Sequence, residues 1–173
     1  MLFSFTGAAK QPGREYDAGA MLEKYSSIVF GVAFSRMKHR ETAEDIMQDV
    51  FVRFIRSSPA LESEEHEKAW FIRATINRCK SFHASAWFRH TAPMPDVPPA
   101  ATPDDEDARA VLEAVSKLPA ALRQTVYLHY FEGMLTREIA QHLKKSESAV
   151  KSTLMRARKR LKQLLEVDDD AFF

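Results

Sequence analysis

The chain has 173 residues, of which 45% are apolar and 28% are charged, a composition typical of a folded globular protein. Its 25 basic and 24 acidic residues nearly cancel, so the net charge neither requires nor excludes a polyanionic partner. The single cysteine, Cys79, excludes an internal disulfide and a cysteine zinc cluster, and it suits a reducing cytoplasm. The longest apolar run, 28–34, is far shorter than the roughly 20 residues of a membrane span, so we expect no membrane insertion.

Residues 1–16 lack the basic start of a secretory signal, and we interpret them as a flexible leader. After them, apolar residues recur every three or four positions, the spacing that places side chains on one face of a helix. The first predicted helix buries Met21, Tyr25, Ile28, Val29 and Val32.

A second helix is predicted from Thr42, a suitable N-cap, to about Ser57, because Pro59 disfavours helix in the residue before it. Its buried face consists of Ile46, Val50, Phe51 and Phe54. A loop at 57–68 leads to a third helix that carries the same period from Trp70 to about Arg89. Strand-like alternation is absent from the pattern.

Residues 91–107 are rich in proline and aspartate and contain almost nothing large and apolar, so they predict a linker that cannot bury enough surface to become ordered. The expected fold is therefore all-α, with two small helical domains at 17–90 and 108–166 joined by a flexible linker. Residues 167–173 form an acidic tail that ends in Phe172 and Phe173. A solvated tail is the simpler interpretation, and a flap that competes with DNA is the alternative.

Helical spacing resumes at Val111, Leu112 and Val115. Leu118-Pro119 starts another helix, because proline is tolerated in the first turn, and Gly133 ends it. We predict that this helix buries Leu122, Val126 and Tyr130.

Two short helices joined by a tight turn follow. Thr136 is the predicted N-cap of the first, with Glu138 in its first turn, and Ser146 is the predicted N-cap of the second. The turn lies at 144–146, where such motifs often place glycine because a left-handed residue is needed. The predicted buried residues are Ile139, Ala140 and Leu143 in the first helix and Val150, Leu154, Ala157, Leu161 and Leu164 in the second.

The segment 136–163 is strongly basic, with nine Lys and Arg residues against two Glu, a net charge of +7. A basic second helix after a tight turn predicts binding in the DNA major groove. A solvated basic face on an amphipathic helix pair is the alternative.

Both halves together resemble the extracytoplasmic-function group of the sigma-70 family, over about residues 20–165. The segment 43–51, AEDIMQDVF, resembles the family's region 2.2. The family's region 4 is resembled, in the same order, by Leu118-Pro119, Arg123 and the segments 138–140, 150–152 and 156–158. A linker separates these segments from the one that resembles region 2.2.

The resemblance implies a sigma factor, which is not an enzyme and needs no cofactor, that directs core RNA polymerase to promoters in the cytoplasm. It implies that the second predicted helix docks on the clamp helices of the largest polymerase subunit, and that the chain also meets the flap of the second-largest subunit. An anti-sigma factor is a further expected partner. The polymerase-binding residues implied are Glu44, Asp45, Gln48, Asp49 and Arg53.

The resemblance also assigns promoter contacts. The residues implied for the −10 element are Trp70, Arg73, Asn77, Lys80, Trp87 and Arg89. Those implied for the −35 element are Arg137, Lys151, Ser152, Met155, Arg156, Arg158 and Arg160. For Trp70, as for its neighbour Phe71, a plain core position is a strong alternative.

Two rival functions stay open from the sequence. A stand-alone helix-turn-helix regulator would leave the segment 43–54 without a role, and a nucleic-acid enzyme would need clustered carboxylates or metal ligands beside the DNA surface. Cys79 and His83 have a spacing compatible with two metal ligands, but no further ligand is near in sequence, so we expect a buried free cysteine and no metal.

Overall fold

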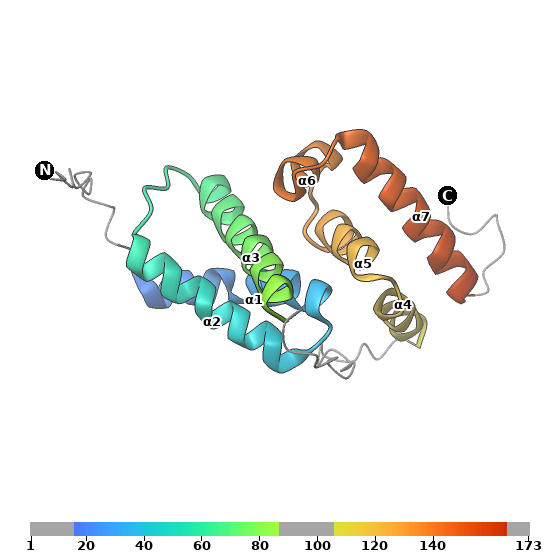
Figure 1. Ribbon diagram of the computed structural model, residues 1–173, viewed down its shortest axis with the longest axis horizontal. Helices are drawn as coiled ribbons and strands as arrows, with labels where there is room; N and C mark the ends of the chain where they lie inside the picture. The colour runs from blue at the N-terminus through green and yellow to red at the C-terminus, as the bar shows by residue number, and fades with distance from the viewer. Residues whose placement is uncertain (1–15, 87–105, 166–173) are drawn as a thin grey trace, which may run out of the picture.

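The computed structural model describes residues 16–86 and 106–165, and every element in these two ranges is a helix (Figure 1). The helices are α1 Ala18–Met37, α2 Arg40–Ser57, α3 Glu64–Ala86, α4 Glu106–Ser116, α5 Ala120–Val126, the π-helix η1 Tyr127–Phe131, α6 Thr136–Leu143 and α7 Glu147–Leu165. The all-α prediction is confirmed. The leader, the acidic tail and most of the predicted linker lie outside the described residues.

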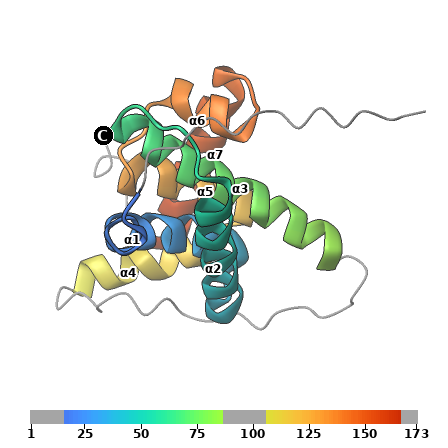
Figure 2. The same ribbon diagram turned by 90° about the vertical axis from the view of Figure 1, so that its left-hand side faces the viewer.

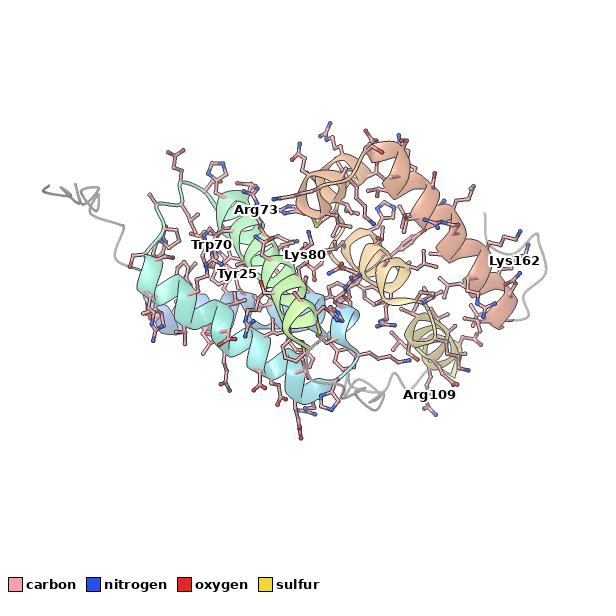
Figure 3. The ribbon with its side chains drawn as sticks, in the orientation of Figure 1. Tyr25, Trp70, Arg73, Lys80, Arg109 and Lys162 are labelled. Atoms are coloured by element: carbon pink, nitrogen blue, oxygen red, sulfur yellow. The ribbon has the colours of Figure 1, made fainter. Side chains whose placement is uncertain are left out.

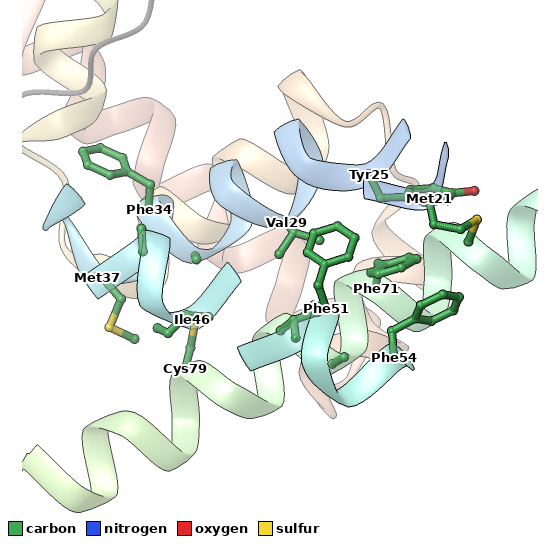
Figure 4. Close-up of a cluster of buried hydrophobic side chains, with 14 residues drawn as sticks. Met21, Tyr25, Val29, Phe34, Met37, Ile46, Phe51, Phe54, Phe71 and Cys79 are labelled. Carbon is green, nitrogen blue, oxygen red and sulfur yellow. The ribbon is translucent and has the colours of Figure 1, made fainter. Parts of the chain in front are cut away.

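Helices α1, α2 and α3 form the first half around an aromatic core (Figure 4). Phe71 is fully buried at its centre, and its ring lies 4.7 Å from that of Tyr25, 5.1 Å from that of Phe51 and 5.0 Å from that of Phe54. The alternative that Phe71 is a core residue is therefore correct. The predicted buried faces of the first two helices are confirmed, with Ile28 only half-buried.

The start of α2 differs from the prediction. The chain leaves α1 through Lys38 in the left-handed conformation, and His39 is extended. The ring Nδ1 of His39 then accepts the backbone N–H of Thr42 at 3.3 Å, so His39 is the N-cap and Thr42 lies in the first turn. The predicted end at Ser57 is confirmed.

Helix α3 begins at Glu64, six residues before Trp70, so the last part of the predicted loop 57–68 is helical. The Ser63 hydroxyl accepts the N–H of His66 at 3.2 Å, and three glutamates lie in the first turn, where the helix dipole favours negative charge.

Helices α4 to α7 form the second half. Ala114 and Leu118 pack with Val126 and with Ala157 and Leu161 of α7 in one buried cluster. Tyr130 was predicted to be buried but is 53% exposed. The π-helix widens the turn beyond 3.6 residues, so the fully buried Leu128 points inward instead.

The two halves share a third buried cluster, which the sequence did not predict. Val32 of α1 and Ile72 and Ile76 of α3 pack against apolar residues of the second half. Those partners are Leu128, Met134, Ile139, Ala140, Leu143, Val150 and Leu154. Figure 2 looks along the line that joins the halves, with the first half in front. We call this contact the interdomain interface.

Candidate DNA and polymerase interface

The start of α6 is held by Glu138, whose carboxylate accepts the backbone N–H of Leu135 at 2.8 Å. Leu135 is therefore the N-cap, and the prediction of Thr136 as N-cap is wrong by one residue. The Thr136 hydroxyl instead donates to Glu147 Oε1 at 2.8 Å, which joins the start of α6 to the start of α7. The position of Glu138 in the first turn is confirmed.

The turn between α6 and α7 has the left-handed residue that such a motif needs. Lys144 adopts φ 55° and ψ 50°, its N–H donates to Gln141, and the N–H of Lys145 donates to Ala140 at 2.9 Å. This pair of hydrogen bonds is the Schellman pattern, which ends a helix sharply. Ser146 then caps α7, because its hydroxyl accepts the N–H of Ala149 at 3.2 Å, as predicted.

Helix α7 has one buried and one basic exposed side. Val150, Leu154, Ala157 and Leu161 are buried as predicted, and Leu164 is half-buried. All seven residues predicted for the −35 element are exposed, and six of them lie on this helix. Lys151 pairs with Glu147 at 2.8 Å, and Arg158 Nε donates to the Tyr130 hydroxyl at 2.8 Å. Helix α7 therefore presents hydrogen-bond donors on its exposed side, and an α-helix fits into the major groove of DNA.

Helix α2 carries the residues predicted to bind polymerase. Asp45, Gln48, Asp49 and Arg53 are exposed and Glu44 is half-buried, on the side away from the buried Ile46, Val50 and Phe54. Two of the carboxylates are held by arginines: Glu44 pairs with Arg40 at 2.7 Å, and Asp49 pairs with Arg78 of α3 at 2.6 Å.

Helix α3 carries the described residues predicted for the −10 element; Trp87 and Arg89 lie outside the described residues. Trp70 is half-buried and packs edge-on against Phe54 and Phe71, with ring centres 5.4 Å and 5.1 Å apart. Arg73 and Lys80 are exposed on the side of α3 that faces the second half (Figure 3), and Asn77 is half-buried.

Cys79 is buried in the first core, and burial raises the pKa of its thiol to about 12. Its thiol therefore stays protonated at neutral pH. Among the described residues, no group of three or more His, Cys, Asp and Glu side chains is placed to hold a metal ion.

Two family models match the chain. The model of sigma-70 region 2 matches residues 21–89, and the model of sigma-70 region 4 matches residues 108–161. The two matches together cover more than half of the chain. The chain belongs to the sigma-70 family. Region 2 thus comprises α1 to α3, and region 4 comprises α4 to α7.

Curated relatives of this sigma-70 protein carry names of the extracytoplasmic-function group. It is 29% identical over 160 residues to the ECF RNA polymerase sigma factor SigM of Mycobacterium tuberculosis, covering 91% of this chain and 82% of the relative. It is 27% identical over 168 residues to the ECF RNA polymerase sigma factor BldN of Streptomyces coelicolor, covering 91% and 64%.

A solved structure shares the fold of this sigma-70 protein across both regions. It is the sigma factor RpoE in complex with the anti-sigma factor NepR from Bartonella quintana, with a TM-score of 0.72 and 23% identity, covering 88% of this chain and 98% of that one. A second, CnrH in complex with the cytosolic domain of CnrY, has a TM-score of 0.57 and 22% identity, covering 88% and 89%.

Sequence reasoning missed two exposed apolar residues on α2. Val52 is 44% exposed and Ile55 is 57% exposed, and both share the outer face with Asp45 and Gln48. The sequence did contain a signal for their exposure. Their helical spacing from Asp45 and Gln48 places them on the outer face, away from the buried stripe of Ile46, Val50 and Phe54. In region 4, the exposed Tyr130 beside Arg158 was missed because the π-helix has no simple sequence signature.

Proposed function

We propose that this sigma factor binds core RNA polymerase through the outer face of α2 and directs promoter-specific initiation, with α3 contacting the −10 element and α7 the −35 element. The observation that carries this proposal is the presence of two unlike exposed faces in family order, a mixed acidic and apolar face on α2 and a basic face on α7.

The α7 face supports reading of duplex DNA. Lys151, Met155 and Arg158 follow one another at helical spacing, and Ser152 and Arg156 lie beside them, so one groove can meet all five. Arginine and lysine supply donors to guanine edges and to phosphates. Arg137, at the start of α6, and Arg160 extend the positive surface toward the backbone.

The α2 face supports docking on protein rather than on DNA. The exposed carboxylate of Asp45 would repel phosphates, whereas Val52 and Ile55 supply the apolar centre that protein interfaces use. We assign this face to the clamp helices of the largest polymerase subunit, with Glu44, Gln48 and Arg53 at its edge. Region 4 is assigned to the flap of the second-largest subunit.

On α3, Arg73 and Lys80 are exposed cations on one face, and Asn77 offers an amide between them. They suit the backbone and bases of an opened −10 strand, which is recognised by polar contacts and stacking. Trp70 is held in the core packing, so we assign it a supporting position beside this strand rather than full insertion. Trp87 and Arg89 stay predictions from the family resemblance.

The chain acts in this proposal as a non-catalytic factor. The rival interpretation as a stand-alone regulator does not use the exposed α2 face, and the rival interpretation as an enzyme has no metal-ligand group among the described residues. No helix in the described ranges is long and apolar enough to span a membrane. The role requires access to polymerase and chromosome, so we place the protein in the cytoplasm. An anti-sigma factor is the proposed regulator.

Association with purified core polymerase tests the docking face. We expect Val52→Glu with Asp45→Arg to lower the affinity of the full-length protein for core enzyme by at least tenfold while its helix content stays unchanged. Glu23→Arg, an exposed charge reversal on α1, is the matched control and should bind normally. Normal binding of the α2 variant would refute the assignment of this face.

A further inference from the structure

We propose that a hollow between α1, α4 and the segment formed by α5 and η1 binds a small amphipathic anion, such as a fatty or aromatic carboxylate. Aromatic side chains would hold the apolar body of this ligand, and Lys38 and Arg123 would meet its charge. The described residues that line the hollow include none from α2, α3 or α7, so this inference goes beyond the proposed function and does not depend on it.

The hollow has the size of a small-molecule site. Its volume is about 330 Å³, and ligand pockets occupy about 300–1,000 Å³. Ser27, Gly31 and Ser35 recur every four residues on α1, and their small side chains leave the space beside this stripe unfilled. Leu112 and Val115 of α4, which lies below α1 in Figure 2, form another wall. Protein interiors rarely leave so much space between packed helices.

Two pairs of stacked aromatic rings line the hollow from different elements. On α1 the ring centres of Phe30 and Phe34 are 5.7 Å apart, and on η1 those of Tyr127 and Phe131 are 5.5 Å apart. Phe131 is 52% exposed, so the hollow opens to solvent beside an aromatic ring. An acyl chain or an aryl ring would bury apolar surface here, whereas the hydroxyl groups of a sugar would lose water without gaining hydrogen bonds from these walls.

The hollow has a positively charged end. Lys38 is the C-cap of α1 and Arg123 lies in α5, and neither pairs with a carboxylate among the described residues. Burial lowers the pKa of Lys38, and the charge of Arg123 lowers it further, because the two cations repel each other. An anion between them would relieve this repulsion.

Arg123 is already oriented for such an anion. Its Nε donates to the carbonyl of Ser35 at 2.7 Å, and Nη1 donates to the carbonyl of Leu118 at 2.6 Å. These bonds fix a guanidinium that is only 7% exposed. Its Nη2 has no hydrogen-bond partner in the part of the chain that the structure describes. The N–H groups of Nη2 are therefore available for charge-assisted hydrogen bonds to a ligand.

The order of the lining residues gives the ligand a direction. Ser27 and Lys38 mark the two ends of the α1 wall, and eleven residues of helix span about 16 Å at about 1.5 Å per residue. The aromatic pairs lie along this wall and the cations at one end of it. The geometry therefore fits an elongated molecule with one terminal negative charge.

Binding of anilinonaphthalene sulfonate, a fluorescent aromatic anion, to the full-length protein tests the site. We expect saturable binding that octanoate or naphthoate displaces, and whichever displaces better identifies a fatty or an aromatic ligand. The neutral analogues octanol and naphthol should displace the probe at least about tenfold less well, because they lack the charge that meets Lys38 and Arg123. Absence of saturable binding, or equal displacement by the neutral analogues, would overturn the proposal.

A lysine pair supplies matched variants. We expect Lys38→Gln to weaken octanoate binding about tenfold and to leave octanol unchanged, whereas Lys38→Arg should bind octanoate like the parent. Lys144→Gln is the control, because Lys144 ends α6 in the same left-handed conformation, with φ 55° against 57° for Lys38, and does not line the hollow. Equal affinities of the Lys38→Gln and Lys144→Gln variants would contradict the assigned cationic end.

Filling the hollow provides a second, independent readout. Leu112→Trp should weaken the binding of the probe and of both carboxylates at least about tenfold, because the larger side chain occupies their space. Val111→Trp, on the neighbouring residue of α4, is 39% exposed in the parent, does not line the hollow and should bind normally. Unchanged binding by Leu112→Trp would place the ligand elsewhere and refute the site. If Leu112→Trp loses helix content, the two lysine variants still decide the matter.

Discussion

Arg156 and Arg158 are two residues apart on α7, yet their surroundings differ. The guanidinium of Arg158 is fixed by the Tyr130 hydroxyl at 2.8 Å, which suits a phosphate contact of constant position. Arg156 makes only a long bond of 3.4 Å to the Thr153 hydroxyl, so its guanidinium can reach toward base edges. The two residues should therefore contribute differently to specificity.

We predict that Arg156→Ala weakens binding to the cognate −35 duplex by about 1–3 kcal/mol relative to a scrambled duplex. Arg158→Ala should weaken both duplexes alike and reduce the salt dependence of binding by about one phosphate contact. Titrations of both variants against both duplexes at two salt concentrations provide the measurement. Equal losses on the two duplexes for Arg156→Ala would refute its base-reading role.

His142 of α6 gives the protein a dependence on pH. Its Nδ1 is buried and has no hydrogen-bond partner among the described residues. Burial lowers the pKa of His142, and the charge of Arg73 lowers it further, against an opposing effect of Glu138. Because the unfolded chain binds this proton more tightly, the contribution to stability is present above about pH 6.5 and is lost as the pH falls below it.

We predict that acidification from pH 7.5 to 5.5 lowers the free energy of unfolding of the parent by up to about 1 kcal/mol more than that of His142→Gln. Urea unfolding at the two pH values measures this difference. His83, whose pKa burial also lowers, is unchanged in both proteins and so cancels from the comparison. An identical pH dependence of the two proteins would exclude His142 as a source.

For the individual helices, the buried apolar faces could be predicted from the sequence, and the first and last residues could be predicted less well. The stripes of α2 and α7 were correct because a stripe records burial directly. The predicted starts of α2 and α6 were wrong because Thr42 and Thr136 are not the N-caps. The ring of His39 caps α2, and the carboxylate of Glu138 accepts the N–H of Leu135 at the start of α6. The π-helix moved Tyr130 outward because a local change of period cannot be read from spacing alone.

The turn between α6 and α7 provides a test at this scale. Lys144 occupies the left-handed region, where a side chain costs about 1–2 kcal/mol and glycine costs little. We predict that Lys144→Gly raises the free energy of unfolding by about 0.5–1 kcal/mol. Lys151→Gly, in the middle of α7, should lower it by about 1 kcal/mol. Destabilisation by Lys144→Gly, measured by thermal or urea unfolding, would show that the turn is not strained.

At the scale of the whole molecule, the sequence predicted two helical regions but not their contact. Val32, Ile72 and Ile76 belong to stripes that indicate burial, and a stripe does not tell which partner covers it. Arg123 was noticed only through family resemblance, although a buried cation between two carbonyls is the clearest polar feature of the interface. The candidate site was predicted better than the interface, because charged residues at helical spacing can be recognised in the sequence without knowledge of the tertiary structure.

The central claim is that the α2 face and the α7 face act together on one polymerase. Run-off transcription with purified core enzyme on a template carrying a cognate promoter tests it most directly. We predict a transcript of defined start that requires this chain and that falls, at equal protein concentration, when either the α2 variant Val52→Glu with Asp45→Arg or Arg156→Ala is used. Duplex binding by the chain without any promoter-dependent transcript from the core enzyme would contradict the account.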